Sequence, residues 1–306
     1  MARHTLGFAG GLALALLSTA AMSADGDWQK VGEALGKPGT EMPGGVYRVA
    51  LPRSDLKVKL DGVDIKTGLA LGGWLAFQKH GQEAMVMGDI VLTSDEVNPV
   101  MKKLEEGGIE ITALHNHLLR NEPFTMYMHV HGRGDPAKLA AALHAGLAES
   151  KTPLAAPALS GSSSAPAAQQ DLGFDPAAIE RVLGRKGKAN GPIFAFSVPR
   201  AEPVKDSGME VPEAMGSATV INFQGTSDGK VATTGDFVLV EKEVNPVIKA
   251  LRENGIEVTA VHNHMLSDEP RIFFMHFWAH DDAEKIAKGL KAALDKVNVT
   301  KKLAQK

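Results

Sequence analysis

Two short segments of the chain carry histidines at a spacing that suits metal binding. Each begins with a His-Asn-His triplet, followed by a Glu-Pro pair and then by a further histidine. Because alternate side chains of a β-strand point to the same face, the two histidines of a triplet would lie side by side. Imidazole nitrogens combined with a carboxylate oxygen suit divalent transition metals, zinc foremost. The predicted ligands are His115, His117, Glu122 and His129 in the first segment, and His262, His264, Glu269 and His276 in the second.

The expected strand pairing limits how many of these residues can share one ion. If a tight turn joins the two strands, so that residue 116 pairs with residue 124, His129 lies about 14 Å along the strands from His115. The favoured site in the first segment is therefore His115, His117 and Glu122. His129 joins this site only if residues 118–126 form a long loop. A site shared between the two segments is the second option.

A structural interpretation of the same residues stays open. A histidine on an apolar strand face is often a hydrogen-bonded structural residue, and Glu122-Pro123 can simply form a turn. The pairs Gly88-Asp89 and Gly235-Asp236 also recur. Glycine within a strand marks a bulge or a close backbone approach, and the aspartate could orient an imidazole, although a turn role is favoured. We prefer the ligand interpretation because three histidines and one glutamate occur in both segments.

An internal repeat organises the whole chain. Residues Gly88 to Leu147 align without a gap on Gly235 to Leu294, and 31 of these 60 positions are identical. Between the two copies lies a stretch rich in Ala, Pro, Ser and Gly, which is typical of a flexible linker. We therefore predict a signal peptide at 1–24, a first repeat domain at 25–150, a linker at 151–170 and a second repeat domain at 171–306.

The elements expected in each copy follow from apolar periodicity and from residues that begin or end helices. In the first copy we expect helices at 27–36, 99–106 and 136–149, with Asn98 as N-cap and Pro99 as the first residue of the second helix. Strands are expected at 46–51, 57–65, 68–78, 84–92, 109–117 and 124–131. This order predicts an α+β fold. Two tandem copies of one domain would each have a mainly antiparallel sheet with helices on one face, related by a pseudo-twofold axis.

Composition and motifs exclude several classes of function. The formal net charge is −3 and no long run of Lys or Arg appears, so nucleic acid is not an expected partner. The sequence has no motif for phosphate binding and none for a serine or cysteine nucleophile, so no nucleotide cofactor is expected. With no cysteine in the chain, any metal site must use His, Asp, Glu or backbone oxygen.

The N-terminus has the pattern of a secretory signal peptide. Arg3 and His4 precede an apolar stretch at 6–17, and small residues follow at 18–24. This stretch is too short for a membrane span, which needs about 20 residues, and no other segment could cross a bilayer. Periplasmic location or secretion after cleavage is therefore expected.

The repeated block resembles the LppY/LpqO family of exported bacterial proteins. The likeness is carried by Gly88-Asp89, Glu96 to Pro99, Gly108-Ile109, the run from His115 to Pro123, and His129, with their partners in the second copy. It covers nearly all of the mature chain. The resemblance implies export and the duplicated architecture, and it implies no established activity. Some members of that family are lipoproteins, which carry their lipid on a cysteine. This chain has no cysteine, so the resemblance does not extend to a lipid anchor.

Three functions fit these observations. The first is a periplasmic protein that binds a divalent metal or a small polar ligand. The second is a metal-dependent hydrolase that uses metal-bound water, and the third is a structural or interaction domain without metal. Binding is ranked first, with enzymatic activity left open, because no separate nucleophile or general base can be named. Tyr127 and His131 stand where the second copy has Phe274 and Trp278, so the first copy is expected to be the more polar and active one.

The sequence predicts that the mature protein begins between Ala21 and Asp27. Small residues suited to signal peptidase end at Ala24, and intact-mass measurement of protein isolated from its native compartment determines the start. A mass that retains residues 1–20 would show that the segment is not a cleaved signal.

Overall fold

The computed structural model describes residues 24–154 and 171–300. The predicted signal peptide and most of the predicted linker lie outside these residues, so both stay predictions. Among the residues that the structure describes, no helix is long and apolar enough to cross a bilayer.

The first copy is built on one antiparallel sheet of six strands in the order β1-β2-β5-β6-β8-β7. The strands are β1 Thr40–Met42, β2 Val46–Pro52, β5 Gly72–His80, β6 Glu83–Thr93, β8 Thr125–Gly134 and β7 Glu110–His115. Three longer helices accompany this sheet: α1 Ala24–Leu35, α3 Val97–Glu106 and α4 Pro136–Leu147. Their apolar side chains and one face of the sheet form a single buried core.

The second copy repeats this architecture. Its sheet has the order β9-β10-β13-β14-β17-β15, which matches the first sheet strand for strand. The strands are β9 Lys188–Asn190, β10 Ile193–Pro199, β13 Ala218–Gly225, β14 Val231–Val240, β17 Ile272–Asp281 and β15 Glu257–His262. The helices are α5 Pro176–Leu183, α6 Glu241–Glu253 and α7 Ala283–Leu294. The predicted α+β fold with a duplicated domain and a pseudo-twofold relation is confirmed.

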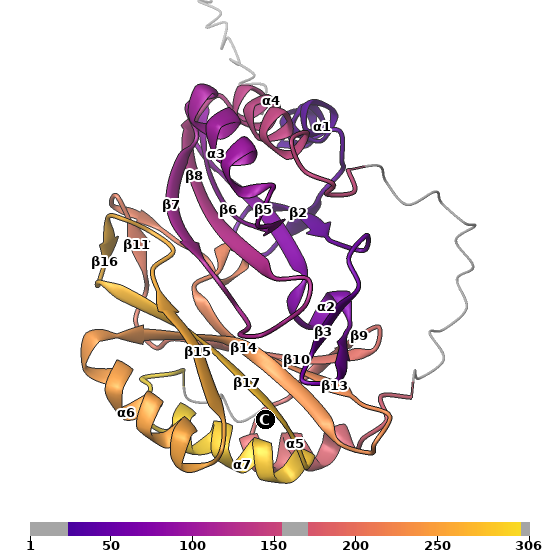
Figure 1. Ribbon diagram of the computed structural model, residues 1–306. Helices are drawn as coiled ribbons and strands as arrows, with labels where there is room; N and C mark the ends of the chain where they lie inside the picture. The colour runs from indigo at the N-terminus through magenta and orange to yellow at the C-terminus, as the bar shows by residue number, and fades with distance from the viewer. Residues whose placement is uncertain (1–23, 155–170, 301–306) are drawn as a thin grey trace, which may run out of the picture.

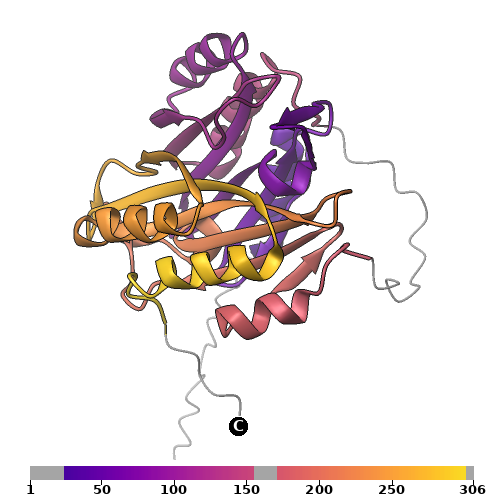
Figure 2. The same ribbon diagram turned by 60° about the horizontal axis from the view of Figure 1, so that its bottom comes forward.

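The two copies pack sheet to sheet, with helices on the two outer sides. Figure 1 shows α1, α3 and α4 at one end of the molecule, α5, α6 and α7 at the other, and both sheets between them. Figure 2 brings the helices of the second copy to the front. Because strand side chains alternate between faces, each sheet presents one face to its own helices and the other to the opposite copy. Polar residues on the inner faces therefore meet across the molecule.

Each copy also extends a short arm over the sheet of the other. The arm of the first copy contains β3 Val58–Leu60, β4 Val63–Ile65 and α2 Thr67–Ala70, and it packs against Ile193 and Trp278. The single strand expected at 57–65 is thus the hairpin of β3 and β4. The first residues of the strand expected at 68–78 belong to the short helix α2. The arm of the second copy, β11 Lys205–Asp206, β12 Met209–Glu210 and the 3₁₀ helix Glu213–Met215, covers apolar residues of β2, β5 and β6. The reciprocal arms make the copies one structural unit.

A buried ion pair anchors the segment at the start of α3. We expected Asn98 to cap this helix and Pro99 to be its first residue, but it begins two residues earlier, at Val97, with Glu96 in the flanking position. The Glu96 carboxylate accepts the backbone N–H of Thr93 at 2.9 Å and lies 2.6 Å from Nη1 of Arg53, a fully buried guanidinium. The second copy repeats the pair as Arg200 and Glu243, also at 2.6 Å. The pair therefore anchors this segment to the sheet in both copies, although α6 begins at Glu241, two residues before Glu243.

Removal of the Glu96 carboxylate is expected to cost about 3–5 kcal/mol of unfolding free energy, because it leaves the buried Arg53 with only the partly exposed Asp55 as a partner. Burial opposes ionisation of Glu96, but hydrogen bonds from Arg53 and two backbone groups outweigh it and lower the Glu96 pKa. The contribution is therefore present above the usual pKa of 4.5 and is lost as the pH falls through the lowered value. Urea unfolding of Glu96→Ala at several pH values measures both effects.

Glu106→Ala is the matched control, because Glu106 lies on the same helix but pairs with Lys103 in solvent. Little change is expected for that variant. Equal losses in the two variants would contradict the role assigned to the buried pair.

Candidate functional site

Strand alternation places the last histidine of each predicted set on the inner face of its sheet. In β8, Met128 points into the helix-covered core, whereas Tyr127 and His129 point toward the other copy. Ala113 pairs with His129 and His115 pairs with Tyr127, with an irregularity between Ile111 and Ala113. The tight turn that we favoured is therefore wrong. A loop at 116–124 joins the strands, and His129 lies beside His115.

Six histidines from both copies form one cluster between the sheets. The ring of His115 lies on that of His262, with centroids 3.6 Å apart. Two further contacts cross between the copies in a pseudo-symmetric way, at 3.7 and 3.8 Å between centroids. We call the set His115, His117, His129, His262, His264 and His276 the six-histidine cluster. The favoured single-copy site is replaced by the second option, a site shared between the copies.

Glu122 and Glu269 do not join the cluster. Both side chains are exposed, and neither belongs to a group of described residues whose ligand atoms converge. The backbone of Glu122 instead pairs with Lys59 of the arm, through N–H···O bonds of 2.8 and 2.9 Å. The expected convergence of Glu122 with His115 and His117 is wrong, because this residue holds the loop against the arm.

Backbone carbonyls orient two of the imidazoles. Nδ1 of His129 lies 3.1 Å from the carbonyl oxygen of Gly88, and Nδ1 of His276 lies 2.8 Å from that of Gly235. A carbonyl oxygen can only accept, so each Nδ1 carries the hydrogen and each Nε2 presents a lone pair. Both Nε2 atoms are buried and have no hydrogen-bond partner in the part of the chain that the structure describes.

The other rings of the cluster leave further nitrogens without partners. Within the described residues, both nitrogens of His115 and of His262, and Nε2 of His117 and His264, are buried and make no hydrogen bond. Burial keeps these rings neutral. It lowers the pKa of His129 to about 4, and it lowers the pKa values of the other five well below the usual 6.5. The cluster thus offers neutral imidazoles with free lone pairs.

Asp89 and Asp236 complete the cluster on one side. An oxygen of Asp89 lies 3.4 Å from Nε2 of His117, and one of Asp236 lies 3.2 Å from Nε2 of His264. Burial raises the pKa of both carboxyl groups. The turn role that we favoured for these aspartates is wrong, since both lie within central strands and beside an imidazole.

The glycines that precede these aspartates allow a close approach of strands. A Cβ atom on Gly88 would lie 2.5 Å from Cδ2 of Leu75, and one on Gly235 would lie 2.0 Å from the carbonyl oxygen of Val220. Glycine is therefore required where the central strands pass their neighbours. The same residues supply the carbonyls that orient His129 and His276.

The residues between and beside the histidines tie the two copies together. The Thr112 hydroxyl donates to the carbonyl of His264 at 2.6 Å, and the Thr259 hydroxyl donates to that of His117 at 2.6 Å. The amides of Asn116 and Asn263 donate back to the carbonyls of Thr259 and Thr112. Each His-Asn-His triplet is thus positioned by hydrogen bonds from the opposite copy.

Three overlapping sets of ligand atoms lie within 4.8 Å of one another: His115 with His129 and His262, His115 with His117 and His276, and Asp236 with His262 and His264. Because the sets share His115 and His262, they describe one centre rather than three separate sites. These histidine and aspartate groups could hold a metal ion, since imidazole and carboxylate are ordinary ligands of divalent transition metals.

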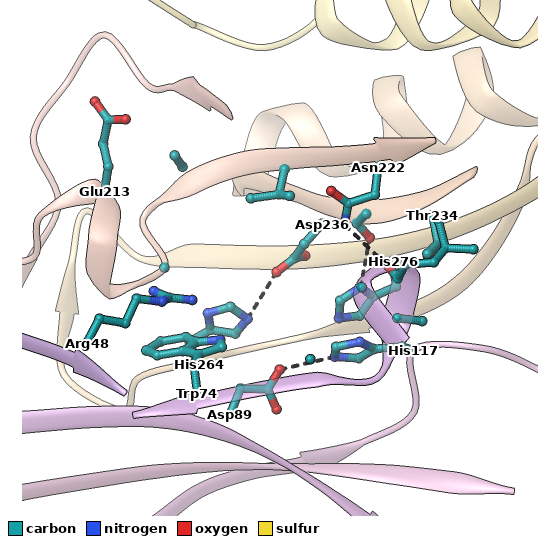
Figure 3. Close-up of a pocket in the computed structure, with 18 residues that line it drawn as sticks. Arg48, Trp74, Asp89, His117, Glu213, Asn222, Thr234, Asp236, His264 and His276 are labelled. Carbon is teal, nitrogen blue, oxygen red and sulfur yellow. Dashed lines mark hydrogen bonds and ion pairs between the residues drawn. The ribbon is translucent and has the colours of Figure 1, made fainter. Parts of the chain in front are cut away.

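A cavity of about 250 Å³ adjoins the cluster at its aspartate side. Figure 3 shows His117 and Asp89 facing His264 and Asp236 across it, with Arg48 and Trp74 at one end and Asn222 and Thr234 at the other. Both copies line the cavity, so the site belongs to the duplicated chain as a whole.

Two stretches of the sequence, residues 29–149 and 177–296, match the family described as Domain of Unknown Function (DUF1259). The chain belongs to this family. Each match covers one copy, so the DUF1259 domain is the unit that was duplicated. The sequence matches no curated protein.

Two solved structures show a distant similarity to this DUF1259 chain. One is the trimeric bacterial microcompartment shell protein PduB, 11% identical over 84% of this chain and 89% of that chain, with a TM-score of 0.22. The other is EtuB from Clostridium kluyveri, 7% identical over 84% and 89% of the two chains, with a TM-score of 0.19. Scores this low do not establish a common fold.

The residues that distinguish the copies do not make two sites of different polarity. The ring of Tyr127 stacks on His117 with centroids 3.3 Å apart, and Phe274 stacks on His264 at the same distance. His131 lies outside the cluster and faces Asp206 on the arm of the second copy, at 3.3 Å. The expectation of two separate sites, the first of them more polar, is wrong because the rings of both copies meet in one cluster.

Loss of the cross-copy threonine hydroxyls is expected to loosen this centre. The double variant Thr112→Val, Thr259→Val leaves two carbonyls without their donors, and about 1 kcal/mol of unfolding free energy is expected to be lost for each. Chemical denaturation measures the loss. Thr300→Val, which removes a longer 3.3 Å bond to Pro199 away from the cluster, serves as the control. A double variant as stable as the parent would contradict the assigned contacts.

Proposed function

We propose that this protein binds a divalent transition metal, zinc foremost, in the six-histidine cluster between its two copies. The observation that carries the proposal is the state of His129 and His276, whose Nδ1 atoms donate to backbone carbonyls while their buried Nε2 atoms have no partner among the described residues. Metal-binding histidines are commonly oriented in this way by a second hydrogen bond.

Energetics favours the same function. A buried polar nitrogen without a partner costs about 1–3 kcal/mol, and the cluster contains several. A bound cation would satisfy these lone pairs together. Neutral imidazoles need not release a proton to bind, so the association requires little change in protonation near neutral pH.

The mixed origin of the ligands supports a shared ion. The set of His115, His117 and His276 takes two residues from the first copy and one from the second. Both copies would therefore contribute ligands to one ion, and metal binding would stabilise their sheet-to-sheet contact.

A second candidate function, a metal-dependent hydrolase, is favoured by the cavity beside the cluster. A metal held there would supply Lewis-acid chemistry for hydrolysis. Asp89 and Asp236 face the same cavity, and their raised pKa values suit groups that hold and transfer a proton. Binding remains the first proposal, since it needs the ligands alone.

We further propose that the protein acts in the periplasm or outside the cell, and that it belongs with the LppY/LpqO proteins. The N-terminal signal pattern supports export. The match of both copies to a domain family of unknown function supports membership of an uncharacterised family with a duplicated domain.

Protein purified without a histidine tag is expected to contain at least one equivalent of a divalent transition metal per chain. The variant His115→Ala, His262→Ala removes the central pair, which is shared by the ligand sets, and should lose the metal. Elemental analysis by mass spectrometry measures the content. Thermal unfolding with and without chelator should show that the metal stabilises the parent protein only.

The variant His80→Ala, His280→Ala removes two histidines outside the cluster and should keep the metal. A parent protein that neither contains nor takes up metal, with a large stability loss in the central variant, would establish a folding role instead. Metal-dependent hydrolysis of p-nitrophenyl esters that is lost in Asp89→Asn, Asp236→Asn at unchanged metal content would favour the hydrolase.

A further inference from the structure

The cavity beside the cluster contains a guanidinium without a carboxylate partner. Arg48 makes one hydrogen bond, from Nη1 to the carbonyl of Ala214, and its guanidinium carbon lies 4.1 Å from the ring centroid of Trp74. It forms no ion pair with the residues that the structure describes. The two buried arginines among these residues, Arg53 and Arg200, each contact two carboxylates. Most Arg48 donors are therefore available to a ligand.

The surroundings of Arg48 keep its charge and its orientation. Burial lowers its pKa to about 10, with Asp89 acting in the opposite direction, so the group stays charged at neutral pH. The contact with Trp74 helps to position the guanidinium, and a Cβ atom at Gly216 would lie 3.1 Å from Cζ2 of the same ring, so glycine leaves room for it. Figure 3 shows Arg48 next to Trp74 and His264 at the cavity end.

A second unsatisfied donor faces the same cavity. The hydroxyl of Thr234 is buried and has no hydrogen-bond partner among the described residues. A larger surface pocket shares Arg48 and Val220 with the inner cavity and is also lined by Lys186 and Lys188. Lys188 adds a positive charge on the solvent side, which attracts anions, while Lys186 beside it pairs with Glu180 at 2.6 Å.

The arrangement differs between the two copies. Ala195 and Val220 occupy the second-copy positions that correspond to Arg48 and Trp74. The pseudo-twofold relation that explains the histidines does not require this arginine. A structural role common to both copies is therefore excluded for Arg48, whereas a ligand that approaches from one side would contact it alone.

We propose that the cavity binds a small oxyanion, a carboxylate or phosphate group, with Arg48 as its recognition residue and with His117, His264 and His276 of the six-histidine cluster in its wall. The assignment deepens the proposed metal function and rests on it for the ion, while the Arg48 contact itself needs no metal. A planar guanidinium binds both groups through two parallel N–H···O bonds. The cavity volume of about 250 Å³ restricts the ligand to a small molecule.

Titration calorimetry with inorganic phosphate and with succinate, in Tris-chloride buffer, tests the proposal on zinc-loaded and on metal-free protein. At least one of the two anions should bind saturably to the native protein. Arg48→Gln should weaken that binding by roughly 10- to 100-fold, the usual effect of losing a charge-assisted bidentate pair. Binding by phosphate alone or by succinate alone identifies the ligand class.

Arg133→Gln is the matched control, because Arg133 is an exposed arginine that pairs with Glu83 far from the cavity. It removes the same charge and should bind the anion like the native protein. Zinc content of Arg48→Gln should also equal that of the native protein. Failure of metal binding with retained anion binding would contradict the proposed function while supporting the Arg48 assignment.

Fluorescence of the native protein gives a measurement that does not depend on folding of the arginine variant. Since Arg48 stacks on Trp74, anion binding should change tryptophan emission, and Trp74→Phe should abolish that change. Two results would overturn the proposal: no saturable binding of either anion by native protein with or without zinc, or equal affinity in native protein and Arg48→Gln.

Discussion

The structure depends on the contact between two sheet faces that carry unpaired nitrogen atoms. Burying these atoms opposes the association of the copies, because each would otherwise bind water. Apolar clusters built from both copies, under the reciprocal arms, supply the opposing stabilisation. Hydrogen bonds between the Thr112 and Thr259 segments and the histidine loops then fix the register of the two faces. The arms therefore hold together a centre that would separate without them.

Duplication within one chain explains which parts of the molecule match and which differ. Residues on the pseudo-twofold axis must contact their own counterparts, as His115 contacts His262. Residues farther from the axis contact different surroundings and can diverge. His131 meets Asp206, whereas its counterpart Trp278 packs in an apolar cluster. The same freedom allows Arg48 in one copy and Ala195 in the other, so a symmetric centre has an asymmetric entrance.

Local patterns in the sequence predicted the elements well and the site less well. Alternating apolar residues and helix-ending glycines identified the strands and helices of each copy, and the repeat revealed the duplication. The ligand set was only partly predicted, because the partners of His115 depend on contacts between residues about 150 positions apart in the chain. Asp89 recurred visibly, yet its role depends on strand pairing with His129. Arg48 gave no signal, since it belongs to no motif and its counterpart in the second copy is Ala195.

Charge balance connects the proposed metal with the proposed anion. A divalent ion among neutral imidazoles introduces two positive charges, and Arg48 adds a third nearby. Asp89 and Asp236 can offset at most two of these when both are ionised, and burial favours their neutral forms. A buried positive excess is costly in a medium of low polarity. An oxyanion between Arg48 and the metal would remove that excess, so occupancy of either position should favour occupancy of the other.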